Sequence, residues 1–464
     1  MTTPDADPGS FRDPAGRVFH RDGRVLRSVN RVAATDFEAV RDTGLLDELV
    51  SEGKLLAYEP VGRELLRDAA PEAVHVLEHP RLPYVSYPYE WPFPLLKAAA
   101  LLHLDVHLAA LARGVSLSDA TAYNVQFRGP RPVFVDHLSF RPYRDGEFWA
   151  GHRQFCEEFL NPLLLRASCG IAHNDWYRGR LSGIPVTDLA RLLPLRGKLS
   201  LNALTHVVLQ ARLQRSSNPS RAARSTAKRK LPLAAFVRML EGLRAWIGKL
   251  HPADGGETVW QGYAERNSYD EEAAARKAAF VDSFVSARQP AVLCDFGCNI
   301  GNFAKISLDA GAGTVVGFDA DHGALERAVA RARAESLELL PLYLDATNPA
   351  PSQGWAEVER RGLHARAGAD ALLALALVHH LAIAGNVPLD RIVAWLVDNA
   401  PSGVIEFVPK GDPMVHELLR LRDDVFADYD AERFLKHVSE RARVVRQERL
   451  SPGGRLLVAF ERSG

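Results

Sequence analysis

One stretch of the chain, residues 291–303 (AVLCDFGCNIGNF), constrains its fold more than any other. Its apolar first half, which ends at Asp295, has the composition of a buried β-strand. Gly297, Asn299 and Gly301 then predict a tight loop, because glycine adopts positive φ angles freely and asparagine is the next best residue for them. A helix follows the loop. A ligand lying across this strand end would therefore meet bare backbone, and we expect a ligand site here.

Strands and helices alternate around this motif, which is typical of a mostly parallel sheet covered on both faces. The pattern predicts helices at 269–287, 323–334 and 389–399, and strands at 314–318, 339–344, 371–378 and 403–408. Two further strands, 444–450 and 455–460, flank a Ser-Pro-Gly-Gly turn. The predicted C-terminal fold is α/β, with a seven-stranded, mostly parallel sheet, helices on both faces and an antiparallel terminal hairpin.

Acidic residues follow the next two predicted strands. Asp319 ends VVGFDAD, where a carboxylate can accept both hydrogen bonds of a ribose diol, although Asp319 or Asp321 could instead cap the following helix. Asp345 ends LYLDATN with Ala346 beside it, and a turn-forming aspartate is the alternative there. Parallel strands bring their carboxyl ends to one edge, so these residues should line one site.

The fourth strand, ALLALALV, carries His379 and His380 to the same edge. Histidine titrates near neutral pH, so one of the pair could remove a proton from an acceptor; hydrogen bonding that only shapes the pocket is the alternative. Beyond the fifth strand, Glu406, Lys410 and Asp412 in IEFVPKGDP are candidate substrate contacts, or parts of a solvated loop.

Together these residues resemble the class I, Rossmann-like S-adenosylmethionine-dependent methyltransferases. The first motif of that family places an acidic residue before Gly-x-Gly-x-Gly, and here Asn299 replaces the central glycine. A dinucleotide-binding loop would need glycine where this chain has Asn299 and Asn302. The stretches ALVHHLAIAGNVPL and EFVPKGDP also look like bacterial nodulation-protein-like methyltransferases.

The resemblance implies S-adenosylmethionine as the cofactor and no metal. It implies a cofactor site made of Asp295, Gly297, Asn299, Gly301, Asn302, Asp319, Asp345 and Ala346. Asp345 would approach the adenine amino group. Tyr263 or Tyr269, in the segment before the first strand, would close the pocket, unless these rings only pack on the sheet.

The N-terminal half has a different pattern, which predicts an α+β domain over residues 1–250, with the methyltransferase domain at 251–464. An Asp-Gly turn within 17–30 indicates a hairpin, and helices are predicted at 94–113, 148–167 and 231–250, with short strands at 124–127 and 132–135. The turn-rich stretch HPADGGE, residues 251–257, marks the boundary.

Within this half, Asp119, Asn124 and Asp136 follow the order and spacing of kinase-like phosphotransferases, to which the half bears a remote resemblance. Neither a glycine-rich phosphate loop nor a strand lysine precedes them, and turn residues at element ends are the alternative. The resemblance implies a degenerate domain that binds substrate or a partner.

Bulk properties narrow the function further. Lys plus Arg and Asp plus Glu both number 57, so net charge favours neither nucleic acid nor an anionic membrane. Cys294 and Cys298 lie at C-x3-C spacing in an apolar strand, which predicts buried side chains rather than a zinc site. The basic run 215–230 lacks aromatic residues for base stacking and indicates a solvated loop. No leader or long apolar run is recognised, so a cytoplasmic protein is expected.

We therefore expect methyl transfer from S-adenosylmethionine to an O, N or C nucleophile of a small-molecule acceptor. Two alternatives stay open: a kinase-like phosphotransferase or non-catalytic binding module fused to a Rossmann-like domain, and an RNA or protein methyltransferase that uses the 215–230 run. The sequence does not indicate an oligomeric state.

Overall fold

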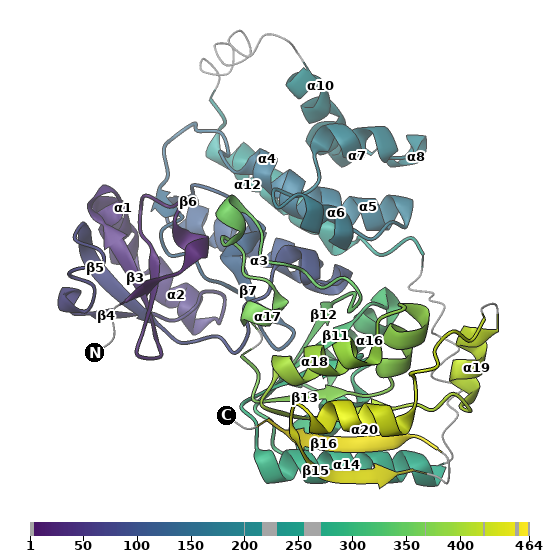
Figure 1. Ribbon diagram of the computed structural model, residues 1–464. Helices are drawn as coiled ribbons and strands as arrows, with labels where there is room; N and C mark the ends of the chain where they lie inside the picture. The colour runs from purple at the N-terminus through teal and green to yellow at the C-terminus, as the bar shows by residue number, and fades with distance from the viewer. Residues whose placement is uncertain are drawn as a thin grey trace.

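The computed structural model describes residues 4–198, 200–215, 230–254, 271–366, 368–420, 423–450 and 454–462. Tyr263, Tyr269 and nearly all of the 215–230 run lie outside these ranges, as does part of the predicted domain boundary. Figure 1 shows a strand-rich region containing β1–β5, a helical layer above it, and the C-terminal sheet with its helices below.

The C-terminal sheet has seven strands in the order β12-β11-β10-β13-β14-β16-β15. The parallel strands are β10 (Val292–Phe296), β11 (Thr314–Asp319), β12 (Leu339–Tyr343), β13 (Ala371–Ala374) and β14 (Ser402–Phe407). The hairpin of β15 (Arg443–Arg449) and β16 (Leu456–Glu461) adds two antiparallel strands at the edge. This arrangement confirms the fold predicted for the C-terminal half.

Helices cover both faces of this sheet because its apolar side chains alternate between them. Leu293, Val315 and Leu339 pack in one apolar cluster with α14 (Glu271–Arg288) and α15 (Asn302–Asp309). Cys294 and Phe318 belong to the cluster on the other face, with residues of α16 (His322–Ala334), α18 (Leu389–Asn399) and α20 (Ala431–Ser439). Two short helices, α17 (Leu363–Arg366) and α19 (Pro413–Leu419), lie in connections.

The N-terminal half begins with a five-stranded antiparallel sheet in the order β1-β2-β3-β5-β4. Its elements are β1 (Asp5–Ala6), β2 (Val18–Arg21), β3 (Arg24–Asn30), α1 (Arg31–Asp42), α2 (Leu45–Ser51), β4 (Glu59–Val61) and β5 (Ala73–His79). The predicted turn between β2 and β3 is present, and Asp22 and Gly23 both have positive φ. The expectation of an α+β N-terminal half is confirmed.

A long buried helix, α3 (Phe93–Ala112), follows the sheet. Two small antiparallel sheets pack beside it: β6 (Val115–Leu117) pairs with β9 (Phe140–Pro142), and β7 (Val125–Arg128) forms a hairpin with β8 (Arg131–Phe134). Among the described helices only α3 has the length and apolar composition of a membrane span, and most of its apolar stretch is packed inside this half.

The helical layer completes the N-terminal half (Figure 1). It comprises α4 (His152–Phe155), η5 (Cys156–Leu160), α5 (Asn161–Cys169), α6 (Asn174–Gly179), α7 (Val186–Leu192), α8 (Leu195–Lys198), α9 (Leu201–Ala203), η6 (Leu204–Val208), α10 (Leu209–Arg215) and α12 (Leu233–Gly248). The elements η5 and η6 are π-helical.

One apolar cluster runs from the N-terminal half into the C-terminal sheet. At the junction the ring of Tyr84 packs edge-on against Phe318, 5.9 Å between centroids. The chain between β12 and β13 contains α17, which contacts the N-terminal half through Arg366. There Arg366 forms a buried ion pair with Glu90. The two halves therefore share a core, and the predicted boundary between 250 and 251 stays a prediction.

The fourth strand is shorter than predicted. β13 ends at Ala374 instead of 378, because Ala376 adopts a φ of 52° and its N–H donates to Glu406 Oε2 at 2.8 Å rather than to a neighbouring strand. His379 and His380 consequently lie at the start of the π-helix η8 (His380–Ala384), beyond the strand end.

Candidate cofactor site

The loop after β10 has the backbone conformation that its sequence predicts. Gly297, Asn299 and Gly301 all have positive φ, at 83°, 49° and 80°. Asn299 supports its own turn, because its Oδ1 accepts a hydrogen bond from the N–H of Ile300 at 2.8 Å. A Cβ on Gly301 would lie 2.8 Å from a methyl group of Leu339. The glycine at this position therefore also permits close packing on β12.

Asp319 joins this loop to the end of β11. The N–H of Asn299 donates to Asp319 Oδ2 at 2.8 Å, and the N–H of Asp321 donates to Oδ1 at 2.9 Å. Burial raises the pKa of Asp319. The helix-capping role falls to Asp321, whose Oδ1 accepts from the N–H of Ala324 at 2.9 Å. Each oxygen of Asp319 keeps a second lone pair that a ligand hydroxyl can use.

The tip of β12 lies directly beside Asp319, because the N–H of Leu344 donates to the carbonyl of Asp319 at 2.9 Å. Asp345 Oδ1 accepts from the N–H and the hydroxyl of Thr347, at 2.9 and 2.6 Å. Asp345 thus has the role of a turn-forming aspartate, the alternative to a contact with adenine. Ala346 beside it is half-buried. The tips of β10, β11 and β12 are contiguous.

Asp295, the last polar residue of β10, is only 2% exposed, and its Oδ2 has no hydrogen-bond partner among the described residues. Burial, followed by the charge of Asp319, raises the pKa of Asp295 to about 7. A buried carboxylate without a partner is costly unless a cation or donor approaches it. This side chain therefore fits a cofactor that carries positive charge.

The histidine pair lies in the chain next to the glycine loop. A Cβ on Gly297 would lie 3.7 Å from the carbonyl of Leu375, four residues before His379. The rings of His379 and His380 are 4.1 Å apart. Burial lowers the pKa of His379 to about 2 and that of His380 to about 4, so both are neutral at pH 7. His379 is fully buried, whereas His380 is partly exposed.

An internal ion network lies beneath this edge of the sheet. Glu406, which is fully buried, pairs with Lys277 at 2.8 Å and lies 3.5 Å from a guanidinium nitrogen of Arg455. Arg455 also pairs with Asp412 at 2.7 Å, and Asp412 caps α19 through the N–H of Met414. Sequence reasoning missed Arg455, because no local pattern connects the terminal hairpin to β14.

The remaining predicted residues lie toward the surface. Lys410 pairs with Asp424 at 2.7 Å, and both side chains are partly exposed. Asn302 is exposed at the start of α15, where its Oδ1 accepts from Arg331 at 2.5 Å. The structure gives Glu406, Lys410 and Asp412 partners within the protein, and their role as substrate contacts stays a prediction.

The N-terminal half brings together its own three predicted residues. Asn124 Nδ2 lies 3.2 Å from Asp119 Oδ1 and 3.2 Å from Asp136 Oδ2, with the Ser139 hydroxyl at 3.1 Å. Burial and the charge of Asp136 raise the pKa of Asp119 to about 6. Arg27 of β3 pairs with Asp136 at 2.7 Å.

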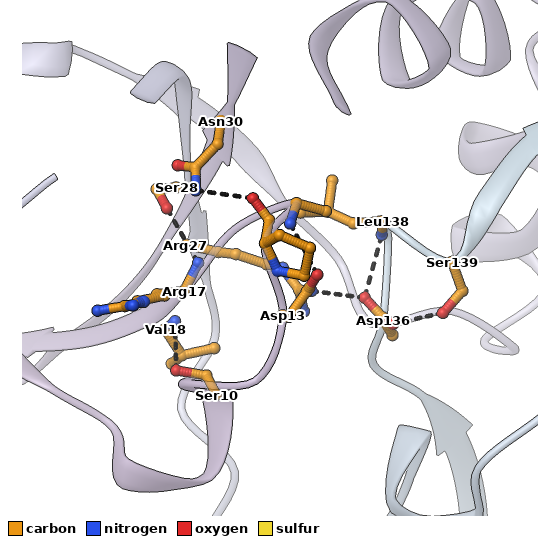
Figure 2. Close-up of polar contacts among 12 residues, drawn as sticks. Ser10, Asp13, Arg17, Val18, Arg27, Ser28, Asn30, Asp136, Leu138 and Ser139 are labelled. Atoms are coloured by element: carbon orange, nitrogen blue, oxygen red, sulfur yellow. Dashed lines mark hydrogen bonds and ion pairs between the residues drawn. The ribbon is translucent and has the colours of Figure 1, made fainter. Parts of the chain in front are cut away.

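Figure 2 shows that Arg27 also reaches Asp13, at 3.0 Å, so that one cation bridges two carboxylates. The kinase-like pattern calls for a lysine on a strand before Asp119, and Arg27 was not predicted as a cation at this position. An arginine within the second strand of the β2–β3 hairpin was the available signal.

The strand order, the left-handed loop after β10 and the terminal hairpin together define a protein with the class I methyltransferase fold. The chain belongs to the family of the nodulation protein NoeA of Rhizobium meliloti (strain 1021). It is 47% identical to that protein over 457 residues, which cover 98% of this chain and 96% of NoeA. The resemblance to nodulation-protein-like methyltransferases is thus confirmed at the level of fold and family. The chain matches no family profile.

Solved methyltransferases resemble the C-terminal half more distantly. The N-methyltransferase NodS from Bradyrhizobium japonicum WM9, in complex with S-adenosyl-L-homocysteine, is 12% identical and covers 45% of this chain and 100% of its own, with a TM-score of 0.32. The magnesium protoporphyrin IX methyltransferase from Synechocystis PCC 6803 is 17% identical and covers 44% and 93%, with a TM-score of 0.31. At these values neither likeness bears on the activity of this chain.

Proposed function

We propose that the chain is an S-adenosylmethionine-dependent methyltransferase whose cofactor lies across the tips of β10, β11 and β12. One observation carries the proposal: contiguous strand ends hold a loop of positive φ angles, a carboxylate that can bind ribose, and a buried carboxylate with one oxygen that has no partner among the described residues. Asp319 would hold the ribose hydroxyls, and Gly297 and Gly301 would leave room for the ligand beside the backbone. Asp295 would face the positively charged part of the cofactor.

S-adenosylmethionine supplies a methyl group on a sulfonium, which is already an activated leaving group. The residues of the chain then mainly orient donor and acceptor in line and exclude water. His380 is neutral at pH 7 and partly exposed, so it can accept a proton from an acceptor hydroxyl or amine. Glu406 holds the backbone at Ala376 and so fixes the turn that leads to the histidines.

The N-terminal half would form part of the acceptor pocket. Arg178 of α6 donates to the carbonyl of Asn348, beyond β12, at 2.7 Å. The rings of His322 and Tyr343 stack 4.7 Å apart at the same edge. The Arg178 contact brings the N-terminal half to the chain that follows β12, beside this stacked pair. A pocket enclosed in this way suits a small-molecule acceptor with an O, N or C nucleophile.

Calorimetry on the full chain tests the cofactor. We expect S-adenosylmethionine to bind at one site per chain. Incorporation of tritiated methyl groups into a bacterial small-molecule extract would then report transfer and give a route to the acceptor. Binding of ATP with magnesium in the absence of any S-adenosylmethionine binding would overturn the proposal.

A second candidate function is nucleotide binding or phosphoryl transfer in the N-terminal half. The convergence of Asp119 and Asp136 on the amide nitrogen of Asn124 favours it, because carboxylate oxygens are ligands for magnesium, and Arg27 places a cation beside them. Asp136→Asn should then weaken binding of ATP with magnesium while leaving S-adenosylmethionine binding unchanged. If wild-type protein gives no heat with ATP and magnesium, this candidate is dropped.

A further inference from the structure

Three side chains with soft-metal ligand atoms meet in the helical layer of the N-terminal half. His152 Nε2 lies 2.9 Å from His206 Nδ1, and Cys156 Sγ lies 3.7 Å from His152 Nε2. One ligand atom from each of the three residues lies within 4.8 Å of the others. Cys156 is fully buried and His206 is 4% exposed, whereas His152 is partly exposed, so the cluster reaches solvent on one side.

The helices that deliver these residues are distorted at this point. His152 begins α4, and Cys156 lies one turn later, on the same helix face, where the helix changes to the π-helix η5. His206 lies within the other π-helix, η6. Single-turn π-helices inside α-helical segments are rare and are frequent at functional sites. Two of them facing each other across one cluster is an observation independent of the ligand distances.

The separations agree with tetrahedral coordination. Zinc–nitrogen bonds of about 2.0–2.1 Å and zinc–sulfur bonds of about 2.3 Å put neighbouring ligand atoms roughly 3.3–3.7 Å apart. The separations of 2.9 and 3.7 Å come within a few tenths of an ångström of these values. We propose that His152, Cys156 and His206 bind a zinc ion or a chemically similar divalent transition metal, with the fourth position open to solvent on the His152 side.

Gln210 supports the arrangement. Its amide lies 2.5 Å from His152 Nδ1. In the structure the amide nitrogen Nε2 faces Nδ1. In the flipped orientation of the amide, Oε1 would accept the Nδ1 proton and so direct the lone pair of His152 Nε2 toward the metal. A metal-free hydrogen bond between the two histidines is the alternative, and it assigns no role to Cys156.

No metal site was predicted from the sequence, because Cys294 and Cys298 were the only cysteine pair at a spacing close to that of a zinc site. The sequence feature that could have indicated the metal site is the H-x3-C spacing of His152 and Cys156 in a predicted helix. His206 follows fifty-four residues after His152.

Cobalt substitution tests the site in the full chain. Chelator-treated protein titrated with Co²⁺ alone should take up one ion per chain, with a thiolate-to-metal charge-transfer band and intense visible bands of a four-coordinate ion, and Zn²⁺ should displace it. Cys156→Ser should remove the charge-transfer band. The matched control is Cys169→Ser, which changes a cysteine of the same helical layer outside the cluster and should leave the band unchanged.

Graded variants keep the test decisive if Cys156→Ser does not fold. Gln210→Ala should weaken metal affinity by about 10–100-fold while the bands remain, as expected for loss of a residue that orients a ligand. His206→Gln should weaken it further. Circular dichroism of each variant checks the fold. Absence of stoichiometric Co²⁺ uptake by folded wild-type protein, or a charge-transfer band that survives in Cys156→Ser, would overturn the proposal.

Discussion

A single carboxylate, Asp319, connects two loops at the carboxyl edge and offers its remaining lone pairs to a ligand. Asp319→Ala should lower S-adenosylmethionine affinity at least about 100-fold, because two hydrogen bonds to a charged group contribute about 1.5–3 kcal/mol each. Calorimetry measures the change. Asp319→Asn, which keeps one acceptor oxygen, should give an intermediate affinity. The control Asp309→Ala removes an exposed carboxylate of α15 and should bind as wild type does. Wild-type affinity in Asp319→Ala would exclude the residue from the site.

The two histidines at the start of η8 should differ in effect. His380→Gln should lower the rate of methyl transfer by about 100- to 10,000-fold, the usual loss for a general base. Because the pKa of His380 is near 4, protonation of His380 should lower the wild-type rate at saturating S-adenosylmethionine only toward pH 4. His379→Gln changes a fully buried ring and should mainly lower stability. Transfer of tritiated methyl groups at several pH values measures the rate of each variant and its pH dependence. Equal rates in His380→Gln and wild type would contradict the role of His380 as the general base.

At the scale of elements, the connection that contains α17 joins the two halves. Arg366 pairs with Glu90, donates to the carbonyl of Val85 at 2.7 Å, and lies over the rings of Tyr84 and Tyr87. Removing one partner of a buried pair leaves an uncompensated charge, so Arg366→Ala should lower the free energy of unfolding by about 3–5 kcal/mol. Urea unfolding measures it. Arg391→Ala, whose side chain is 79% exposed, should change stability by less than about 0.5 kcal/mol. Equal stability of the two variants would show that the pair is not needed.

The elements also show where sequence reasoning succeeds. β10, β11 and β12 could be predicted because each is a short apolar run with an acidic residue at or near its end, and the φ of Asn299 follows from local chemistry. The end of β13 depends on Glu406, thirty residues away, and no local pattern reveals it. The same holds for the site. The strand-tip residues are local features, whereas Arg27, Arg455 and the metal-ligand cluster come together only through tertiary packing.

Across the whole molecule, ten of the described histidines have pKa values lowered mainly by burial. They are His79, His103, His107, His137, His152, His173, His206, His322, His379 and His380. An unfolded histidine has a pKa near 6.5. In the folded protein burial lowers the pKa of His79 to about 4 and that of His103 to about 3. Above pH 6.5 these rings are neutral in both states. Below it the unfolded chain binds protons that the folded chain does not, so stability is lost as pH falls from 6.5 toward 4.

Six carboxylates of the described residues have raised pKa values and oppose this trend: Asp13, Asp119, Glu158, Asp295, Asp319 and Glu326. The pKa values of Asp119, Glu158 and Asp295 are raised to about 6, 7 and 7, so these groups recover stability as pH falls below their folded values. The ten histidines outnumber the six carboxylates, and each group contributes up to about 1.4 kcal/mol per pH unit. The urea midpoint should therefore fall steadily from pH 7 to pH 5. His103→Phe, which replaces a ring whose nitrogens have no partner in the described part of the chain, should flatten that slope by about one proton, whereas the exposed His251→Gln should not. A midpoint that stays constant down to pH 5 would show that these histidines are protonated in the folded protein.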